Sequence, residues 1–101
     1  MLHQKMIRVV IVEDDKLARL GIISSISWEN YGMTIIFDTG NPQKALEYME
    51  EHGADLLLTD LSMPVMSGLD LVKKARKFLT SLQFAVLTMH QNFDYIQESL
   101  R

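Results

Sequence analysis

Two short apolar runs in this chain end abruptly at acidic residues. Residues 6–12 are mostly aliphatic and β-branched, and an acidic triplet begins at Glu13. Residues 55–59, three leucines among them, form a second run that stops at Asp60. Continuous apolar runs of this length, without polar alternation, are typical of strands that are covered on both faces of a parallel sheet. We therefore expect a parallel sheet with carboxylates at the carboxyl ends of its strands.

Strand-like and helix-like segments alternate along the whole sequence. The strands are predicted at residues 6–12, 33–37, 55–59 and 82–88. Apolar residues at helical spacing predict helices that begin after Asp14 or Asp15, at Asn41, shortly before Leu71, and at Asn92. The third of these helices is predicted to carry the following residues on one face: Leu71, Val72, Ala75 and Leu79. Strict alternation of this kind favours an α/β fold of three layers, a doubly wound parallel sheet with helices on both faces.

Size and composition narrow the possible functions. A chain of 101 residues can build one domain, and 48% hydrophobic with 23% charged residues is ordinary for a globular protein. The net charge of −3 gives no global attraction for nucleic acid or an anionic membrane, and the absence of cysteine excludes thiolate metal sites and disulfides. No apolar stretch approaches the ~20 residues that a membrane span requires. We expect a cytoplasmic protein without membrane contact.

The acidic residues that end the strands are expected to share one crevice. In open parallel sheets, ligands bind outside the carboxyl ends of strands, near the point where the strand order reverses. Glu13, Asp14 and Asp60 should meet there, with Thr88 at the end of the fourth strand beside them. Taken singly, each has a simpler interpretation: a helix cap, a turn former or a strand residue. Together they indicate a cation site, because neighbouring carboxylates disfavour one another's ionised form.

Three segments carry a resemblance to a known family. A resemblance to the receiver domain of two-component response regulators is carried by residues 9–15, residues 58–64 with Gly68, and residues 86–88. Residues 26–28 and 92–95 resemble the receivers that precede AraC-type DNA-binding domains. The resemblance covers nearly the whole chain and implies a flavodoxin-like fold. It also implies that residues 1–101 form a C-terminally incomplete receiver domain, lacking the last strand and helix of the family.

The resemblance assigns a role to each candidate site residue. Asp60 corresponds to the phosphoacceptor, which takes a phosphoryl group from a phosphohistidine of a sensor histidine kinase. Asp14 and Asp60 would ligate Mg²⁺ directly, together with the backbone carbonyl of Ser62, and Glu13 would act through a bound water. Thr88 would bind a phosphoryl oxygen through its hydroxyl.

The resemblance also implies a place in transcription regulation by a two-component system. The protein would catalyse its own phosphorylation at most, so it is not expected to be an enzyme in the usual sense. It would reach DNA only through an effector domain that this sequence does not contain. A homodimer is a further possibility, because receivers commonly pair.

Two other functions stay open at the level of sequence. The family's lysine at the end of a fifth strand is not found here, and Met89 follows Thr88 where the family favours a small residue. Together with an unprotected fourth strand, these departures support a phosphate-independent, receiver-like interaction module. A small phosphohydrolase or flavin-binding protein of the same layered fold is disfavoured, because Ser62 stands two residues beyond Asp60 where a second aspartate would be needed. The first strand is also not followed by a glycine-rich phosphate loop.

Overall fold

The computed structural model describes residues 5–87, which form an open, wholly parallel sheet with connecting helices. In chain order the elements are β1 (Ile7–Val12), α1 (Lys16–Ser25), the 3₁₀ helix η1 (Trp28–Tyr31), β2 (Met33–Thr39), α2 (Pro42–His52), β3 (Leu56–Thr59), α3 (Gly68–Ala75) and β4 (Gln83–Val86). The strand order is β2-β1-β3-β4, and every neighbouring pair is parallel. The predicted alternation of strands and helices is confirmed over this range.

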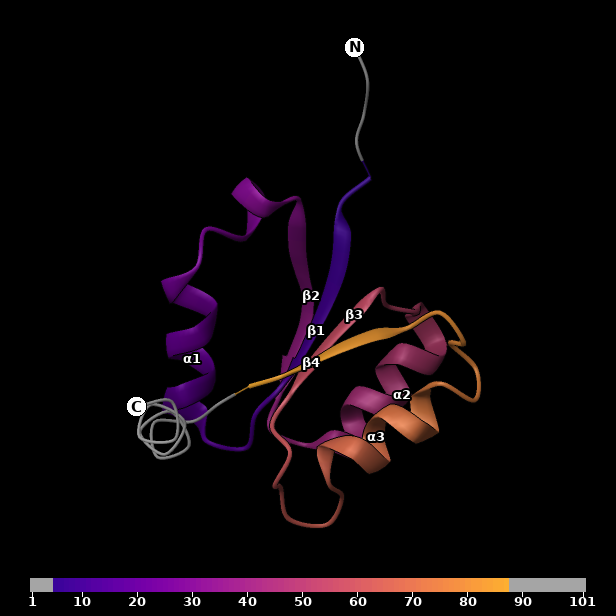
Figure 1. Cartoon of the computed structure of the whole chain (residues 1–101). Coiled ribbons are helices and arrows are strands. Elements are labelled where there is room, and N and C mark those ends of the chain that lie inside the picture. The colour runs from indigo at the N-terminus through magenta and orange to yellow at the C-terminus, as the bar shows by residue number, and fades with distance from the viewer. Residues whose placement is uncertain (1–4, 88–101) are drawn as a thin grey trace, which may run out of the picture.

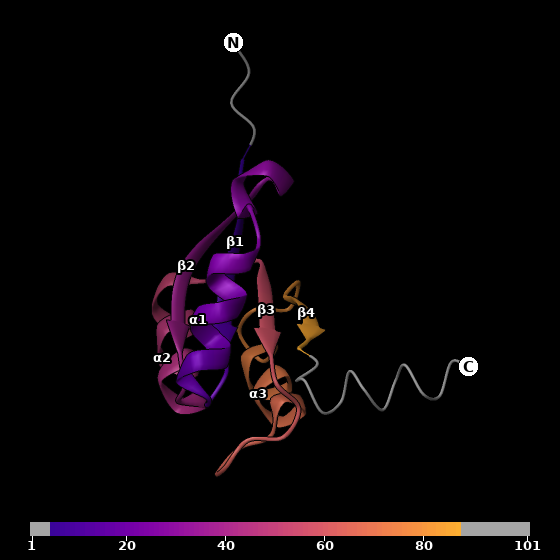
Figure 2. The ribbon, with the colours of Figure 1, turned by 90° about the vertical axis from the view of Figure 1, so that its left-hand side faces the viewer.

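The helices cover both faces of the sheet. Helix α1 lies on one face, and α2 and α3 lie on the other (Figures 1 and 2). Two separate apolar clusters result: Val10 and Val12 pack toward α2 and α3, whereas Val9 and Ile11 pack with Trp28 on the side of α1. The three-layer, doubly wound fold predicted from the sequence is therefore confirmed.

Strand β1 explains why its sequence shows no polar alternation. It lies between β2 and β3 in the sheet, and its residues Val9, Val10, Ile11 and Val12 are all fully buried. A central strand that is covered on both faces has no solvent side, so each position favours an apolar residue. This buried strand delivers Glu13 and Asp14 to one edge of the sheet.

Local capping starts each α-helix at a definite residue. Asp15 caps α1, because its Oδ1 atom accepts hydrogen bonds from the amides of Leu17 at 3.0 Å and Ala18 at 3.4 Å. Asn41 caps α2 in the same way, and the Ser67 hydroxyl caps α3. Of the two residues predicted as the first cap, Asp15 takes this role, which leaves the Asp14 carboxylate available for other contacts.

Within the described part of the chain, no helix has the length and apolar character to span a bilayer.

Several predicted element boundaries were wrong. Strand β2 continues to Thr39, two residues beyond the prediction, because a shift in register between Val9 and Val10 lets β1 keep pairing with it. Helix α3 ends before Leu79, and β4 begins after Leu82. The turn between them is fixed by Arg76, whose guanidinium donates two hydrogen bonds to the Leu82 carbonyl at 2.8 and 3.0 Å. The predicted end of the fourth strand and the helix at Asn92 lie outside the described residues.

Val65, in the loop between β3 and α3, has a left-handed backbone. Its φ angle is 74°, and its side chain is fully exposed. A β-branched residue is strained in this region, at a cost of about 1–3 kcal/mol, whereas glycine adopts it freely. We expect Val65→Gly to raise the free energy of unfolding by about 1 kcal/mol, net of the entropy that glycine adds to the unfolded chain. Urea unfolding measures the change, and a variant less stable than the wild type would contradict the prediction.

Candidate metal centre

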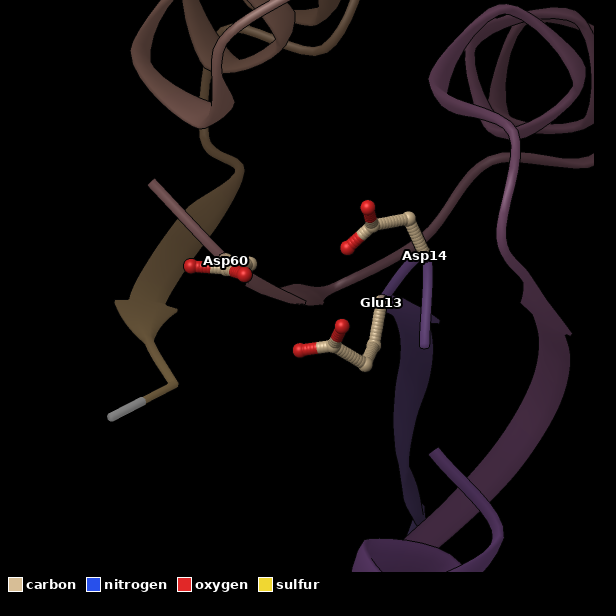
Figure 3. A group of neighbouring side chains, drawn as sticks. All are labelled: Glu13, Asp14 and Asp60. Atoms are coloured by element: carbon tan, nitrogen blue, oxygen red, sulfur yellow. The ribbon is translucent and has the colours of Figure 1, made fainter. Parts of the chain in front are cut away.

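Three carboxylates converge where β1 and β3 end. Glu13 and Asp14 follow β1, and Asp60 follows β3. Each residue offers one oxygen atom, and these three oxygens lie within 4.8 Å of one another. In Figure 3, the carboxylates of Glu13 and Asp14 point toward the side on which Asp60 lies. The convergence predicted from the strand ends is therefore present in the structure.

Sheet hydrogen bonding holds these residues in register. The last residues of the two strands, Val12 and Thr59, are paired in the sheet. The Asp60 amide donates to the Val12 carbonyl at 3.2 Å, and the Glu13 amide donates to the Thr39 carbonyl at 3.1 Å. The acids thus continue the hydrogen-bonding pattern of the sheet by one residue, so their backbones are fixed by the fold.

Burial distinguishes two of the three acids, Glu13 and Asp60, from ordinary surface carboxylates. Glu13 is 1% exposed and Asp60 is 7% exposed, while Asp14 lies at the surface. Glu13 Oε2 accepts a hydrogen bond from the Asp15 amide at 2.8 Å, but Oε1 is buried and has no hydrogen-bond partner among residues 5–87. The pKa of Glu13 is raised to about 7, mainly by burial and also by the carboxylates of Asp14 and Asp60, against the lowering effect of the Asp15 amide. The pocket therefore favours a cation or a proton.

This raised pKa predicts a specific dependence of stability on pH. The folded state holds the Glu13 proton up to about pH 7, whereas the unfolded state releases it near 4.5. The folded state thus binds more protons, so the free energy of unfolding should fall as pH rises from 5 to 8, by up to about 3 kcal/mol in the absence of divalent cations. Glu13→Gln, which resembles the protonated form, should remove most of this dependence. Urea unfolding at several pH values with chelator present measures both proteins, and parallel pH profiles would contradict the assignment to Glu13.

The donor set suits a hard divalent cation. Carboxylate oxygens are the ligands that Mg²⁺ prefers, and the unpartnered Glu13 Oε1 is a buried polar atom that a cation or its bound water would satisfy. Ser62 lies in the loop that follows β3, where its amide donates a long hydrogen bond of 3.4 Å to Asp60 Oδ1. Thr88, the remaining predicted site residue, lies outside the described residues, as does Met89.

Gly68 allows the loop after β3 to close beneath Asp60. A Cβ atom at Gly68 would lie 2.2 Å from the Asp60 carbonyl oxygen and 3.1 Å from Thr59 Cγ2. The Gly68 amide donates to the Leu61 carbonyl at 2.9 Å, and the Thr59 hydroxyl donates to the Asp60 carbonyl at 2.9 Å. The sequence indicated Gly68 only as part of the family resemblance, so the close approach of its backbone to Asp60 is a new finding.

Arg19 is a second residue that the sequence did not indicate. Its guanidinium contacts the Glu13 carbonyl and the Asp38 carboxylate, six and nineteen residues away along the chain. A lone arginine in a helix gives no signal for contacts of this kind, because they depend on how α1 packs beside the end of β2.

Comparison with protein families and curated proteins supports the resemblance to receiver domains. Residues 9–101 match the family described as the response regulator receiver domain. The chain is 30% identical over 96 residues to the uncharacterized transcriptional regulatory protein YesN of Bacillus subtilis, and 27% identical over 96 residues to the transcriptional regulatory protein HptR of Staphylococcus aureus. Each match covers 95% of this chain, but only 26% of YesN and 37% of HptR. The chain thus spans well under half the length of these relatives.

Solved structures of receiver-containing regulators are similar to this chain in fold and in sequence. The REC domain of AraT, a response regulator from Geobacillus stearothermophilus, matches with a TM-score of 0.77 and 38% identity, over 95% of this chain and 74% of that one. A two component transcriptional regulator AraC from Clostridium phytofermentans matches with a TM-score of 0.77 and 28% identity, over 91% of this chain and 71% of that one. The predicted resemblance to receivers, and to those of AraC-type regulators in particular, is confirmed.

Proposed function

This chain belongs to the response regulator receiver domain family, and we propose that it accepts a phosphoryl group on Asp60 from a sensor histidine kinase. The observation that carries the proposal is the convergence of Glu13, Asp14 and Asp60, three carboxylate oxygens within 4.8 Å of one another. A purely structural role would not explain why two of these acids are buried together, because burial of neighbouring like charges is costly.

Asp60 is the nucleophile in this proposal. One of its carboxylate oxygens attacks the phosphorus of a phosphohistidine, the P–N bond breaks, and its electron pair leaves with the imidazole of the kinase. The product is an acyl phosphate on Asp60. Hydrogen bonds from the Asp60 amide to the Val12 carbonyl and from the Thr59 hydroxyl to the Asp60 carbonyl fix the backbone that carries this side chain. Phosphoryl transfer depends mostly on such positioning and on charge stabilisation.

The acids of the pocket would hold Mg²⁺ for this reaction. Asp14 and Asp60 are proposed as direct ligands, with the Ser62 backbone carbonyl, and Glu13 is proposed to act through a water. When bound, Mg²⁺ would supply positive charge that offsets the repulsion between these carboxylates and an incoming phosphoryl group. The Thr88 hydroxyl is proposed to bind a phosphoryl oxygen.

We extend the proposal to the polypeptide to which this domain belongs. YesN and HptR are transcriptional regulatory proteins of which this chain matches roughly a quarter to two fifths. A DNA-binding effector domain on the same polypeptide would let phosphorylation of Asp60 control transcription in the cytoplasm, with DNA contacted only through that domain. The match to 74% of the AraT REC domain supports the proposal that further receiver elements, a fifth strand and helix, belong to the complete domain.

Direct phosphorylation tests the proposal. The chain is incubated with Mg²⁺ and a small phosphodonor such as acetyl phosphate, and intact mass spectrometry follows the uptake of one phosphoryl group. Borohydride reduction of the acyl phosphate, followed by peptide mapping, should locate the modification at Asp60. Absence of Mg²⁺-dependent uptake, or modification at another residue, would contradict the proposal.

The outermost strand of the sheet, β4, supports one alternative function, a phosphate-independent interaction module. Strand β4 (Gln83–Val86) carries no charge, and Val86 is 38% exposed. Among residues 5–87 no element pairs with the outer edge of this strand. Uncharged edges can add a strand from another chain. This alternative predicts that Asp60→Asn leaves partner binding unchanged, whereas the receiver proposal predicts that partner binding depends on phosphorylation.

A further inference from the structure

Arg19 in α1 reaches back to the peptide that joins Glu13 to Asp14. Its Nη1 atom donates a hydrogen bond to the Glu13 carbonyl oxygen at 2.6 Å, and its Nε atom donates to Asp38 Oδ2 at 3.1 Å. The Arg19 side chain is only 15% exposed. A guanidinium presents its donors in a rigid planar fork, so one side chain can hold two acceptors in a fixed arrangement. Arg19 thereby connects the acidic loop that follows β1, residues 13–15, to the end of β2.

The hydrogen bond from Arg19 leaves no polar backbone atom of Glu13 without a partner. The Glu13 amide already donates to the Thr39 carbonyl at 3.1 Å, so both polar backbone atoms of Glu13 are hydrogen-bonded on the β2 side. The carbonyl that Arg19 holds belongs to the peptide between Glu13 and Asp14. Its orientation therefore sets the directions in which both carboxylate side chains leave the backbone.

The space for this guanidinium is provided by Gly40. A Cβ atom at Gly40 would lie 2.9 Å from Arg19 Nη1, and 3.4 Å from both the Asp14 Cα atom and the Glu13 carbonyl oxygen. A side chain here would press on the arginine and on the acidic loop together. The loop after β2 thus leaves room for the contact between Arg19 and the Glu13 peptide.

We propose that Arg19, itself held by Asp38, is a positioning residue that aligns Glu13 and Asp14 with Asp60 for binding of a divalent cation. The inference rests on the proposed function, since it concerns the same pocket. Arg19 would act through the Glu13 carbonyl and not as a ligand. Groups that orient metal ligands in this indirect way commonly contribute 10–100-fold to metal affinity.

Mg²⁺ affinity, measured by isothermal titration calorimetry on the whole chain, tests this role. Arg19→Gln should weaken Mg²⁺ binding by about tenfold. Asp38→Asn, which keeps Arg19 but removes the charge that holds it, should weaken binding by roughly threefold, as expected for a partly exposed ion pair. Arg19→Lys should recover part of the loss, because its single nitrogen can still donate to the Glu13 carbonyl.

Arg8→Gln is the matched control. Arg8 also donates from its guanidinium to a backbone carbonyl, that of His52 at 2.7 Å, but it does so near the opposite end of β1. Its replacement should leave Mg²⁺ affinity unchanged. Urea unfolding without Mg²⁺ establishes that each variant is folded, and Asp38→Asn carries the test if Arg19→Gln does not fold.

The outcomes separate this inference from the proposed function. Mg²⁺ affinity of Arg19→Gln and Asp38→Asn equal to that of the wild type would overturn the positioning role and leave the proposed function intact. An equal loss in Arg8→Gln would also overturn it, because the effect would then be one of general stability. A wild-type chain that binds no Mg²⁺ at millimolar concentration would overturn both.

Discussion

The Asp60→Asn variant is expected to take up phosphate roughly a thousandfold more slowly than the wild type, or not at all. An amide oxygen lacks the negative charge of the carboxylate nucleophile, and removal of a nucleophile commonly costs several orders of magnitude in rate. The substitution is nearly isosteric, and the asparagine oxygen can still accept the Ser62 amide. The initial rate of mass increase with Mg²⁺ and acetyl phosphate measures the effect.

Asp70→Asn is the control for this experiment. Asp70 is an exposed acid in the first turn of α3, ten residues from Asp60 and outside the carboxylate cluster. Its replacement should leave the rate of phosphate uptake unchanged. Uptake by Asp60→Asn at the wild-type rate would show that another residue is the phosphoacceptor, and would remove the chemical role assigned to the pocket.

Gly68→Ala should lower the free energy of unfolding by about 3 kcal/mol, the upper range for overpacking a tight site. The added methyl group would meet the Asp60 carbonyl oxygen at 2.2 Å, and that oxygen belongs to backbone, which cannot simply rotate away. The loop must therefore move, and Asp60 with it. We also expect weaker Mg²⁺ binding, because the carboxylate would leave its place beside Glu13 and Asp14.

A second glycine gives the matched control. Gly21 lies within α1, is exposed, and an added Cβ atom there would have no neighbour within 4 Å. Gly21→Ala should raise the free energy of unfolding by about 1 kcal/mol, because alanine favours a helix interior more than glycine does. Urea unfolding compares the two variants. If Gly68→Ala were as stable as the wild type, the close packing of the loop against Asp60 would be contradicted.

The sequence predicted the elements whose signals are local. Residues 6–12 were predicted as a strand covered on both faces because every position except Arg8 is apolar, and Val9 to Val12 are in fact fully buried. The convergence of Glu13, Asp14 and Asp60 followed from one rule, that parallel strands end at the same edge of a sheet. Both predictions needed only the composition and length of single segments.

The features that the sequence did not predict depend on contacts between distant segments. The end of α3 before Leu79 depends on Arg76, whose guanidinium reaches the Leu82 carbonyl. The extension of β2 is accompanied by a shift in its pairing register with β1, between Val9 and Val10. The contacts of Arg19 depend on the position of α1 relative to Asp38, near the end of β2.

The central claim is that Glu13, Asp14 and Asp60 serve one cation. The most direct test is a Mg²⁺ titration of the whole chain with the side-chain carboxyl carbons of these three residues followed by ¹³C NMR. The account predicts that all three signals shift along one saturation curve with a single dissociation constant, while the carboxyl signal of Asp70 stays in place. Three signals that follow different curves, or that do not move at millimolar Mg²⁺, would contradict it.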